Sequence, residues 1–448
     1  MTHEHDNVND PTTLTAIADM ALKHAQQQGA QEVSVSVSEV KETEIAWRDN
    51  QVERLMRSTS RGLSLQLFVD GRYMSVGSSD LRSQALKPFI EESIAMTRAL
   101  EPDPFRRLPD PVYYKGRQEQ ELQLEDPYYV HVSPEDRLNC LKEAESAARE
   151  QDPRIISVTT AYSDTLAHSV RMHSNGFYGE KSGTSFFVSA EVSVQDNNDK
   201  RPEESDYAGA RFWQDLKPAK EIGLSAKKRA LQRLGSTSLP SQKTTLVLEN
   251  RVAGRLIGLL LSPLSAYAIQ QKRSCFAQHQ NQSIASSLLT IVDAPFVKKG
   301  FGSRLFDSEG LSAHAFPVIE AGILKNYYID FYYGLKLGLQ PTTASVSNLQ
   351  FQYGQSDLMQ LISNIKEGIL VTGFLGGNSN ATTGDFSLGI LGFRIVRGQI
   401  DMPVSELNIA ANQKDLWKQL VAVGNDPYPY SSYQTPSLVF DNVQVAGT

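Results

Sequence analysis

The sequence predicts an α+β protein with two domains, the second of them rich in strands. Apolar residues alternate in short runs, as they do from Leu63 to Val69, which is typical of half-buried strands. Apolar residues with helical spacing occur before and after groups of predicted strands, and predicted helices do not alternate with single strands. A doubly wound parallel sheet is therefore not expected. The 448 residues are enough for at least two hydrophobic cores.

The first hundred residues predict the order helix, three strands, helix. Asp10-Pro11 predicts an N-cap and a first helical residue, and the apolar stripe at 14–25 predicts the buried face of that helix. Alternating valines at 33–37 predict the first strand. Asp70-Gly71 predicts the tight turn of a hairpin between the next two strands. A second helical stripe at 86–94 completes the unit.

A second group of strands and helices is expected after residues 101–130, a stretch rich in Pro, Asp and Tyr that predicts a connecting loop. Ser133-Pro134 predicts a capped helix start. The elements expected after it are strands at 155–162, 169–173 and 185–194, a charged loop at 196–206 and a helix at 222–234. Residues 236–242 predict a linker. The expected domains are therefore 1–235, with loop 101–130 separating two sub-units, and 236–448.

The second domain begins with a predicted strand at 244–248 and an apolar helix directly after it. A further helix is expected at 358–365, with Ser356 as its N-cap. The stretch from Gly373 to Phe393 carries glycines that alternate with apolar residues and has no basic side chain. Because glycine costs backbone entropy, such a cluster indicates positive φ angles or the close approach of another strand.

The charge, apolar runs and cysteine content of the chain argue against a nucleic-acid-binding, membrane-spanning or secreted protein. The formal net charge of −7 gives no electrostatic surface for nucleic acid, so direct binding to DNA or RNA is not expected. The longest apolar run, 252–269, is interrupted by Arg255 and Pro263, so no membrane span is expected. Only two cysteines occur, and the first residues contain no apolar signal-peptide core. A cytoplasmic protein is the expectation.

Several segments in one order resemble the TldD/PmbA family, the "modulator of DNA gyrase" peptidases, and in particular its PmbA or TldE-like branch. Phe306-Asp-Ser-Glu-Gly resembles the family's Asp-x-Glu-Gly signature, and Ile319-Glu-Ala-Gly-Ile-Leu resembles its Ile-x-x-Gly-x-Leu strand. The glycine-rich stretch from Gly373, Ser405-Glu-Leu-Asn-Ile-Ala-Ala-Asn and Asp415-Leu-Trp complete the match. The resemblance is specific over about 240–447 and weaker over about 10–235.

The resemblance also shows a departure. The TldD branch resembles zinc proteases with His-Glu-x-x-x-His on a helix and a later Cys, but this chain has neither that motif nor any Cys after Cys275. By this resemblance, the positions that hold the zinc ligands and the general base in the TldD branch are occupied here by Gly258, Leu259 and Pro263. The implied protein is a metal-free subunit without catalytic residues or cofactor of its own. Zinc is expected only in a TldD-like partner, and together the two chains would degrade or mature unfolded peptides.

Three alternatives remain open. The chain could act alone as a metallopeptidase with non-standard ligands, or as a non-proteolytic interaction protein acting on gyrase or a toxin system. It could also form a homodimer in place of the heterodimer with a TldD-like paralogue.

A serine nucleophile elbow at Gly384–Gly389 is disfavoured, because Gly-Asp-Phe-Ser-Leu-Gly has one residue too many before the serine.

Two groups of polar residues are candidates for a substrate cleft. Asp307 and Glu309 would point the same way if they lay on one strand, although a pair of turn acids is the simpler interpretation. Thr382, Thr383 and Asp385 allow the same two interpretations, since Asp often binds turn amides. Asn412, at the end of a segment that resembles the family, completes the candidate set.

An aromatic cluster between Tyr327 and Tyr333 is the candidate interface. Tyr327, Tyr328 and Tyr332 are its proposed contact residues, because tyrosine is enriched where chains associate. Packing in the core of a single chain is the alternative. The sequence alone leaves both possibilities open.

Overall fold

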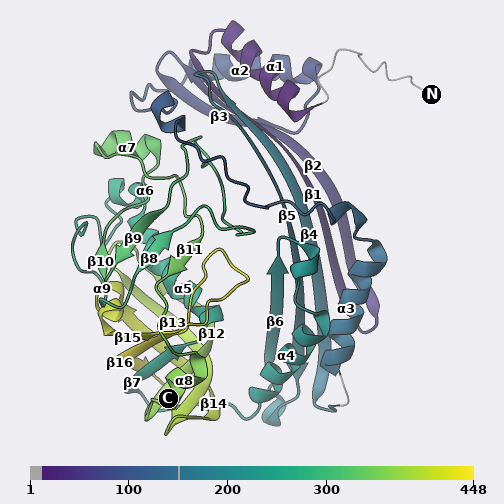
Figure 1. Ribbon diagram of the computed structural model, residues 1–448, viewed down its shortest axis with the longest axis vertical. Coiled ribbons are helices and arrows are strands. Elements are labelled where there is room, and N and C mark those ends of the chain that lie inside the picture. The colour runs from purple at the N-terminus through teal and green to yellow at the C-terminus, as the bar shows by residue number, and fades with distance from the viewer. Residues whose placement is uncertain (1–12, 150–151, 448) are drawn as a thin grey trace.

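The computed structural model describes residues 13–149 and 152–447 of the chain. Figure 1 shows a long curved sheet on one side, with helices on its outer face, and the C-terminal half packed along its inner side. Helices and strands are segregated and most strand pairs are antiparallel, so the predicted α+β class is confirmed. No helix in the described ranges is long and apolar enough to cross a membrane.

The N-terminal half is built on one antiparallel sheet of six strands in the order β3-β2-β1-β4-β5-β6. The turn Asp70-Gly71 joins β2 to β3 with positive φ at both residues, which is the conformation predicted for a tight hairpin. The sheet contains strands from both sides of loop 101–130. Its strands are β1 (Glu32–Arg48), β2 (Gln51–Val69), β3 (Arg72–Ser78), β4 (Ile155–His173), β5 (Tyr178–Val194) and β6 (Glu203–Ala210).

Two pairs of helices cover the same face of this sheet. One pair is α1 (Leu14–Gln27) with α2 (Ser83–Thr97), and the other is α3 (Pro134–Arg149) with α4 (Ala219–Gln232). The first pair packs on Val35 and the second on Ile45, and both residues lie on one face of β1 because side chains alternate along a strand. The other face of the sheet is therefore left for the C-terminal half.

The C-terminal half contains two sheets. The larger has the order β14-β13-β12-β7-β16-β15, and β14 also pairs with β16, so five of its strands form a closed ring. The smaller has the order β10-β9-β8-β11. The strands of the two sheets are β7 (Gln242–Leu248), β8 (Ile291–Asp293), β9 (Phe316–Glu320), β10 (Ile323–Leu324), β11 (Leu349–Phe351), β12 (Glu367–Ser379), β13 (Asp385–Val396), β14 (Gln399–Asn412), β15 (Leu420–Val423) and β16 (Leu438–Ala446).

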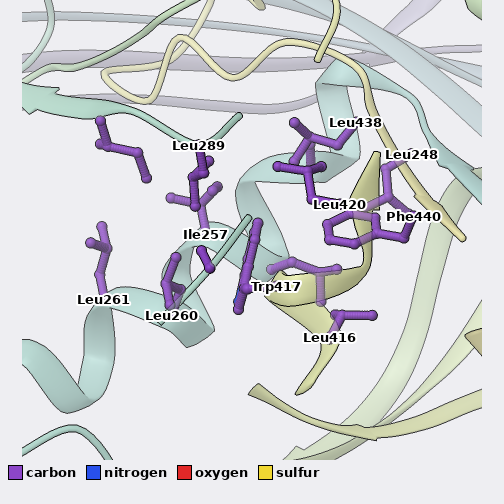
Figure 2. Packing of buried hydrophobic residues seen from close by; sticks show 14 of the residues in the cluster. Leu248, Ile257, Leu260, Leu261, Leu289, Leu416, Trp417, Leu420, Leu438 and Phe440 are labelled. Atoms are coloured by element: carbon purple, nitrogen blue, oxygen red, sulfur yellow. The ribbon is translucent and has the colours of Figure 1, made fainter. Parts of the chain in front are cut away.

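Five α-helices accompany these sheets in the described part of this half. The longest, α5 (Asn250–Leu261), buries Ile257 and Leu260 in the same core that holds Trp417 and Phe440, whose ring centroids lie 5.4 Å apart (Figure 2). Burial of the apolar side chains of this core stabilises the C-terminal half of the molecule. The shorter helices are α6 (Ala266–Gln270), α7 (Phe331–Leu337), α8 (Leu358–Ser363) and α9 (Gln413–Leu416).

Four local predictions need comment. The strands expected at 155–162 and 169–173 are one continuous strand, β4, and the loop expected at 196–206 includes the start of β6. The N-cap of α8 is Asp357 and not Ser356, since the Asp357 carboxylate accepts the backbone N–H of Gln360. Asp10-Pro11 lies outside the described residues; the described helix begins at Leu14 with Thr13 as its N-cap.

Candidate functional site

The segment from Lys299 to Ser312 joins the two halves at the inner face of the long sheet. Phe301 stacks on Phe187 of β5 with ring centroids 5.4 Å apart, and its carbonyl accepts a hydrogen bond from Arg211 Nη2 at 2.7 Å. Phe306 packs edge-on against Phe177, which lies between β4 and β5, at 5.2 Å. These contacts place residues 303–306 against the polar inner face of β4 and β5.

Asp307 is buried at the centre of this segment, with 1% of its surface exposed. Its Oδ1 accepts the backbone N–H groups of Glu309 and Leu311, at 2.9 and 3.0 Å. Its Oδ2 accepts the N–H of Ala344 at 2.9 Å and the hydroxyl of Thr343 at 3.3 Å. Asp307 is therefore a turn acid that fixes the loop, as the simpler interpretation of the sequence expected.

Glu309 projects from the same turn toward helix α7. Its Oε2 accepts the backbone N–H of Phe331 at 2.7 Å. Burial raises the pKa of Glu309 to about 8, and the nearby charges of Asp307 and Asp330 act in the same direction. A carboxyl group that binds a proton near neutral pH is thus held at the junction of the two halves.

Cationic side chains face this turn from the sheet. Arg171 of β4 is close enough to Asp307 and Glu309 for their charges to favour its ionised form, although burial lowers its pKa overall. Burial also lowers the pKa of Lys181 of β5 to about 8, helped by the charges of Arg304 and Arg171. In the register of the sheet Arg171 pairs with Gly179, so Arg171 and Lys181 lie on the same face.

A cavity of about 440 Å³ adjoins this cluster, which is within the usual size range of ligand sites. Its walls come from four parts of the chain: β4 and β5, the loop at 120–124, Arg211 directly after β6, and the segment 303–306. Lys181, Arg211, Arg304 and Glu180 provide its charged lining, with Phe306 and three leucines as apolar walls. This cavity and the Asp307–Glu309 turn are the candidate functional site.

The second predicted group forms a separate network. Asn412 Nδ2 donates to Asp385 Oδ1 at 2.8 Å and to the carbonyl of Thr383 at 3.0 Å. The Thr383 hydroxyl accepts the N–H of Asp385, and Thr382 donates its N–H to Asn380 Oδ1. These residues stabilise the tight turn between β12 and β13, where Gly384 has φ +89°. Among the described residues no hydrogen bond or ion pair joins this turn to Asp307 or Glu309.

The predicted interface tyrosines divide into two types. Tyr327 and Tyr328 are 4% and 5% exposed, and their hydroxyls donate to the carbonyl of Phe276 and to Asp293. Their burial within one chain favours the core alternative for both. Tyr332 is only partly buried; its hydroxyl donates to Asp103 Oδ2 at 2.7 Å, and its ring lies against Arg106. Tyr332 thus remains available as a candidate contact residue.

Comparison with known proteins decides the family. The PmbA/TldA metallopeptidase domain 1, central domain and C-terminal domain match residues 33–97, 128–234 and 241–447. The crystal structure of a candidate modulator of DNA gyrase from Bacteroides thetaiotaomicron VPI-5482 has a TM-score of 0.95 and 38% identity, over 97% of this chain and 99% of that one. The chain belongs to the PmbA/TldD metallopeptidase family.

A further relative indicates the branch of the PmbA/TldD family, and another solved structure shares the fold. Metalloprotease PmbA of Escherichia coli O157:H7 is 29% identical over 419 residues, which is 92% of each chain. TldE from Thermococcus kodakarensis shares the fold, with a TM-score of 0.86 at 20% identity over 96% of this chain and all of that one. The resemblance drawn from the sequence motifs is confirmed: this is a PmbA/TldE-like family member.

The family name implies a metal, and the described residues of this chain do not fit one. Helix α5 has no His, Cys, Asp or Glu. Its Arg251 instead reaches the N-terminal sheet, with Nη1 3.3 Å from Asp206 Oδ1 and Nη2 donating to the carbonyl of Ser205 at 3.0 Å. Within 13–149 and 152–447 no three His, Cys, Asp or Glu side chains are grouped so that they could hold a metal ion. A guanidinium group on this helix would repel a divalent cation.

The cationic half of the site was not predicted from the sequence. Arg171, Lys181 and Arg304 were not chosen as site residues, because Arg304 and Asp307 are more than a hundred residues away from Arg171 and Lys181 in the sequence. Lys181 also lies outside the strand segments that were expected. A usable signal is present: Gly179, Lys181, Gly183 and Ser185 alternate with the residues of the other face, so Lys181 is a lone long cation on a face of small residues.

Proposed function

We propose that this chain is the metal-free subunit of a two-chain peptidase, and that it holds peptide against a zinc-bearing TldD-like partner. The observation that carries the proposal is helix α5. In the TldD branch that helix carries the metal motif, whereas here Arg251 and the N-cap residue Glu249 form ion pairs with Asp206 and Arg229 of the N-terminal half. The helix serves to tie the two halves together.

The preserved fold supports a role in an assembly. The chain matches the PmbA-type relatives across nearly their whole length, so loss of the metal motif has not been accompanied by loss of any domain. A subunit of this kind contributes walls and contacts around the metal site of its partner. The polar inner face of the long sheet and the cavity lined by Lys181 and Phe306 are surfaces on which such a subunit would hold an unfolded peptide.

We propose a cytoplasmic location for this assembly. Cys140 and Cys275 are both free, and together they are all the cysteines of the chain. Free cysteines in a chain of this length suit a reducing compartment.

One alternative has a specific observation in its favour. The Bacteroides structure is described as a candidate modulator of DNA gyrase, so an interaction with gyrase without proteolysis is the second candidate function. With a net charge of −7, such an effect would act through protein contacts and not through DNA. A stand-alone metallopeptidase would need ligands that α5 lacks.

The test is reconstitution. The chain is purified alone, a TldD-like chain with His-Glu-x-x-x-His is purified alone, and the two are mixed at micromolar concentration. Size-exclusion chromatography with light scattering reports association, and cleavage of an unfolded peptide reports activity. The proposal expects a mixed complex and cleavage that a motif Glu→Gln change in the partner abolishes. A pull-down that recovers gyrase, with no complex between the two chains, would favour the alternative.

A further inference from the structure

Lys181 is a partly buried cation whose ammonium group contacts an aromatic ring and not a carboxylate in the described part of the chain. Its side chain leaves β5 on the inner face of the sheet, and its ammonium lies 4.3 Å from the centre of the Phe306 ring. Within the described ranges its Nζ makes no hydrogen bond or ion pair, whereas the Nζ of Lys299 donates to Asp215 Oδ2 at 2.6 Å. The charge of Asp307 lies close enough to favour the ionised form of Lys181, but no carboxylate contacts its ammonium directly among the described residues. A partly buried ammonium group with no anion in contact is costly, so we expect a ligand at this position.

Two arginines share the cavity with Lys181. Arg211 and Arg304 use their terminal nitrogens on backbone carbonyls, those of Phe301 and Val346 among them, while the Nε of each is buried and has no partner. Glu180 is the one carboxylate that we find in the described lining, and it accepts a hydrogen bond from the Tyr178 hydroxyl. The lining therefore has an excess of positive charge in a protein that is acidic overall.

We propose that this cavity binds a peptide carboxylate, either the C-terminal carboxylate or an acidic side chain, with Lys181 as its principal partner. The proposal rests on the proposed function, since it assigns a subsite to the peptide that this subunit holds. Arg211 and Arg304 contribute a positive field. Charge-assisted hydrogen bonds to an ammonium group are among the stronger polar contacts in proteins.

The remaining lining favours a peptide over other anions. Leu122, Leu124 and Leu305 provide apolar walls, and the side-chain amides of Gln120 and Gln123 can both donate to and accept from a peptide main chain. A volume of about 440 Å³ holds a few residues and not a polymer. A nucleic acid backbone would require an extended basic surface, which the acidic chain does not offer.

The experiment measures binding to the isolated full chain by calorimetry. Three N-acetylated peptides of Ala, Ser and Leu are compared: one with a free C-terminal carboxylate, the same peptide as its C-terminal amide, and an amide that ends in Glu. We expect at least one carboxylate-bearing peptide to bind about tenfold more tightly than the plain amide, the size of one charge-assisted hydrogen bond. Preference for the free acid identifies the main-chain terminus, and preference for the Glu peptide identifies a side chain.

Lys181→Met keeps the apolar stem over Phe306 and removes the charge, so it should abolish the preference. Lys220→Met, on the exposed face of α4, makes the same charge change away from the cavity and should leave the preference intact. Thermal melting verifies that both variants fold. Equal affinity for the three peptides, or an undiminished preference in Lys181→Met, would overturn the proposal. Because reconstituted cleavage is measured separately, equal affinity of the unmodified chain for the three peptides, with cleavage by the mixed complex retained, refutes the subsite alone.

Discussion

Arg251 of helix α5 and Asp206 of strand β6 form an ion pair across the two halves of the molecule, and their side chains are only 14% and 13% exposed. Lys217 also approaches Asp206, with Nζ 3.4 Å from its Oδ2. Contacts of this kind are worth more than exposed pairs because less solvent screens them. The helix on which the family resemblance would place the metal motif of the TldD branch therefore fixes here the orientation of the halves.

Asp206→Asn should destabilise the protein by about 2 kcal/mol, because it leaves Arg251 and Lys217 without their anion in a mostly buried site. The measurement is urea unfolding at pH 7. The control is Glu44→Gln, which breaks an exposed pair with Arg54 and should cost less than about 1 kcal/mol. Equal losses of unfolding free energy in the two variants would show that the ion pair between the halves stabilises the protein no more than an exposed pair does.

Glu309→Gln should change how stability depends on pH. The folded-state pKa of Glu309, about 8, is above its ordinary value of 4.5, so the folded protein binds the extra proton between these values. The stability from this proton is fully present below about pH 4.5 and is lost as the pH rises through about 8. The amide side chain of the variant would stay neutral and keep an acceptor for the N–H of Phe331, so the variant should be more stable than the parent at pH 9, by about 2 kcal/mol.

The measurement for Glu309→Gln is urea unfolding at pH 5.5, 7 and 9. Glu320→Gln is the control, since the Glu320 side chain is 58% exposed. The control should run parallel to the parent protein at all three values. A Glu309→Gln curve that also runs parallel to the parent would mean that Glu309 is ionised in the folded protein throughout this range.

Gly384→Ala should cost more than Gly71→Ala, although both glycines have positive φ, +89° and +71°. A Cβ at Gly384 would lie 3.0 Å from Asn412 Oδ1 and 3.3 Å from Cys275 Sγ, whereas nothing lies within 4 Å of one at Gly71. We expect about 1 kcal/mol for Gly71→Ala from backbone strain alone, and about 2–3 kcal/mol for Gly384→Ala. Equal shifts in urea midpoint would argue against crowding at the β12–β13 turn.

Tyr328→Ala and Tyr332→Ala should separate core from surface. Tyr328 is buried and bound to Asp293, so its truncation should lower stability by about 3–5 kcal/mol. Tyr332 is only partly buried, between Arg106 and Lys336, so its truncation should cost about 1–2 kcal/mol. If Tyr332 contacts a partner, Tyr332→Ala also weakens the complex in light scattering. A Tyr328→Ala protein that melts normally but fails to associate would reverse these assignments.

The sequence predicted elements whose signals are local. The Asp70-Gly71 turn and the helix start at Ser133-Pro134 depend on neighbouring residues only, and both are present. The unity of β4 was missed because Asp164 stands in the middle of the strand and breaks its apolar pattern. In the structure Arg137 of α3 and the hydroxyl of Tyr162 bind that carboxylate, at 2.6 and 2.7 Å, and a single sequence shows no such long-range compensation.

The candidate site was predictable only in part, for the same reason. The Asp307-x-Glu309 pair belongs to a recognisable local motif, and the structure places it at the junction of the halves. Lys181 and Arg304 become one site only through the docking of residues 303–306 on β5. Thr383, Asp385 and Asn412 share a network because β13 and β14 pair there, but that turn is separate from the cavity.

Peptide cleavage combined with metal analysis tests the central claim most directly. The purified chain is assayed for bound zinc by elemental analysis and for hydrolysis of an unfolded peptide, alone and after mixing with a TldD-like chain that carries His-Glu-x-x-x-His. The account predicts no stoichiometric zinc and no hydrolysis for this chain alone, and hydrolysis by the mixture with zinc in proportion to the partner. Stoichiometric zinc in the pure chain, with peptide cleavage that a chelator abolishes, would contradict it.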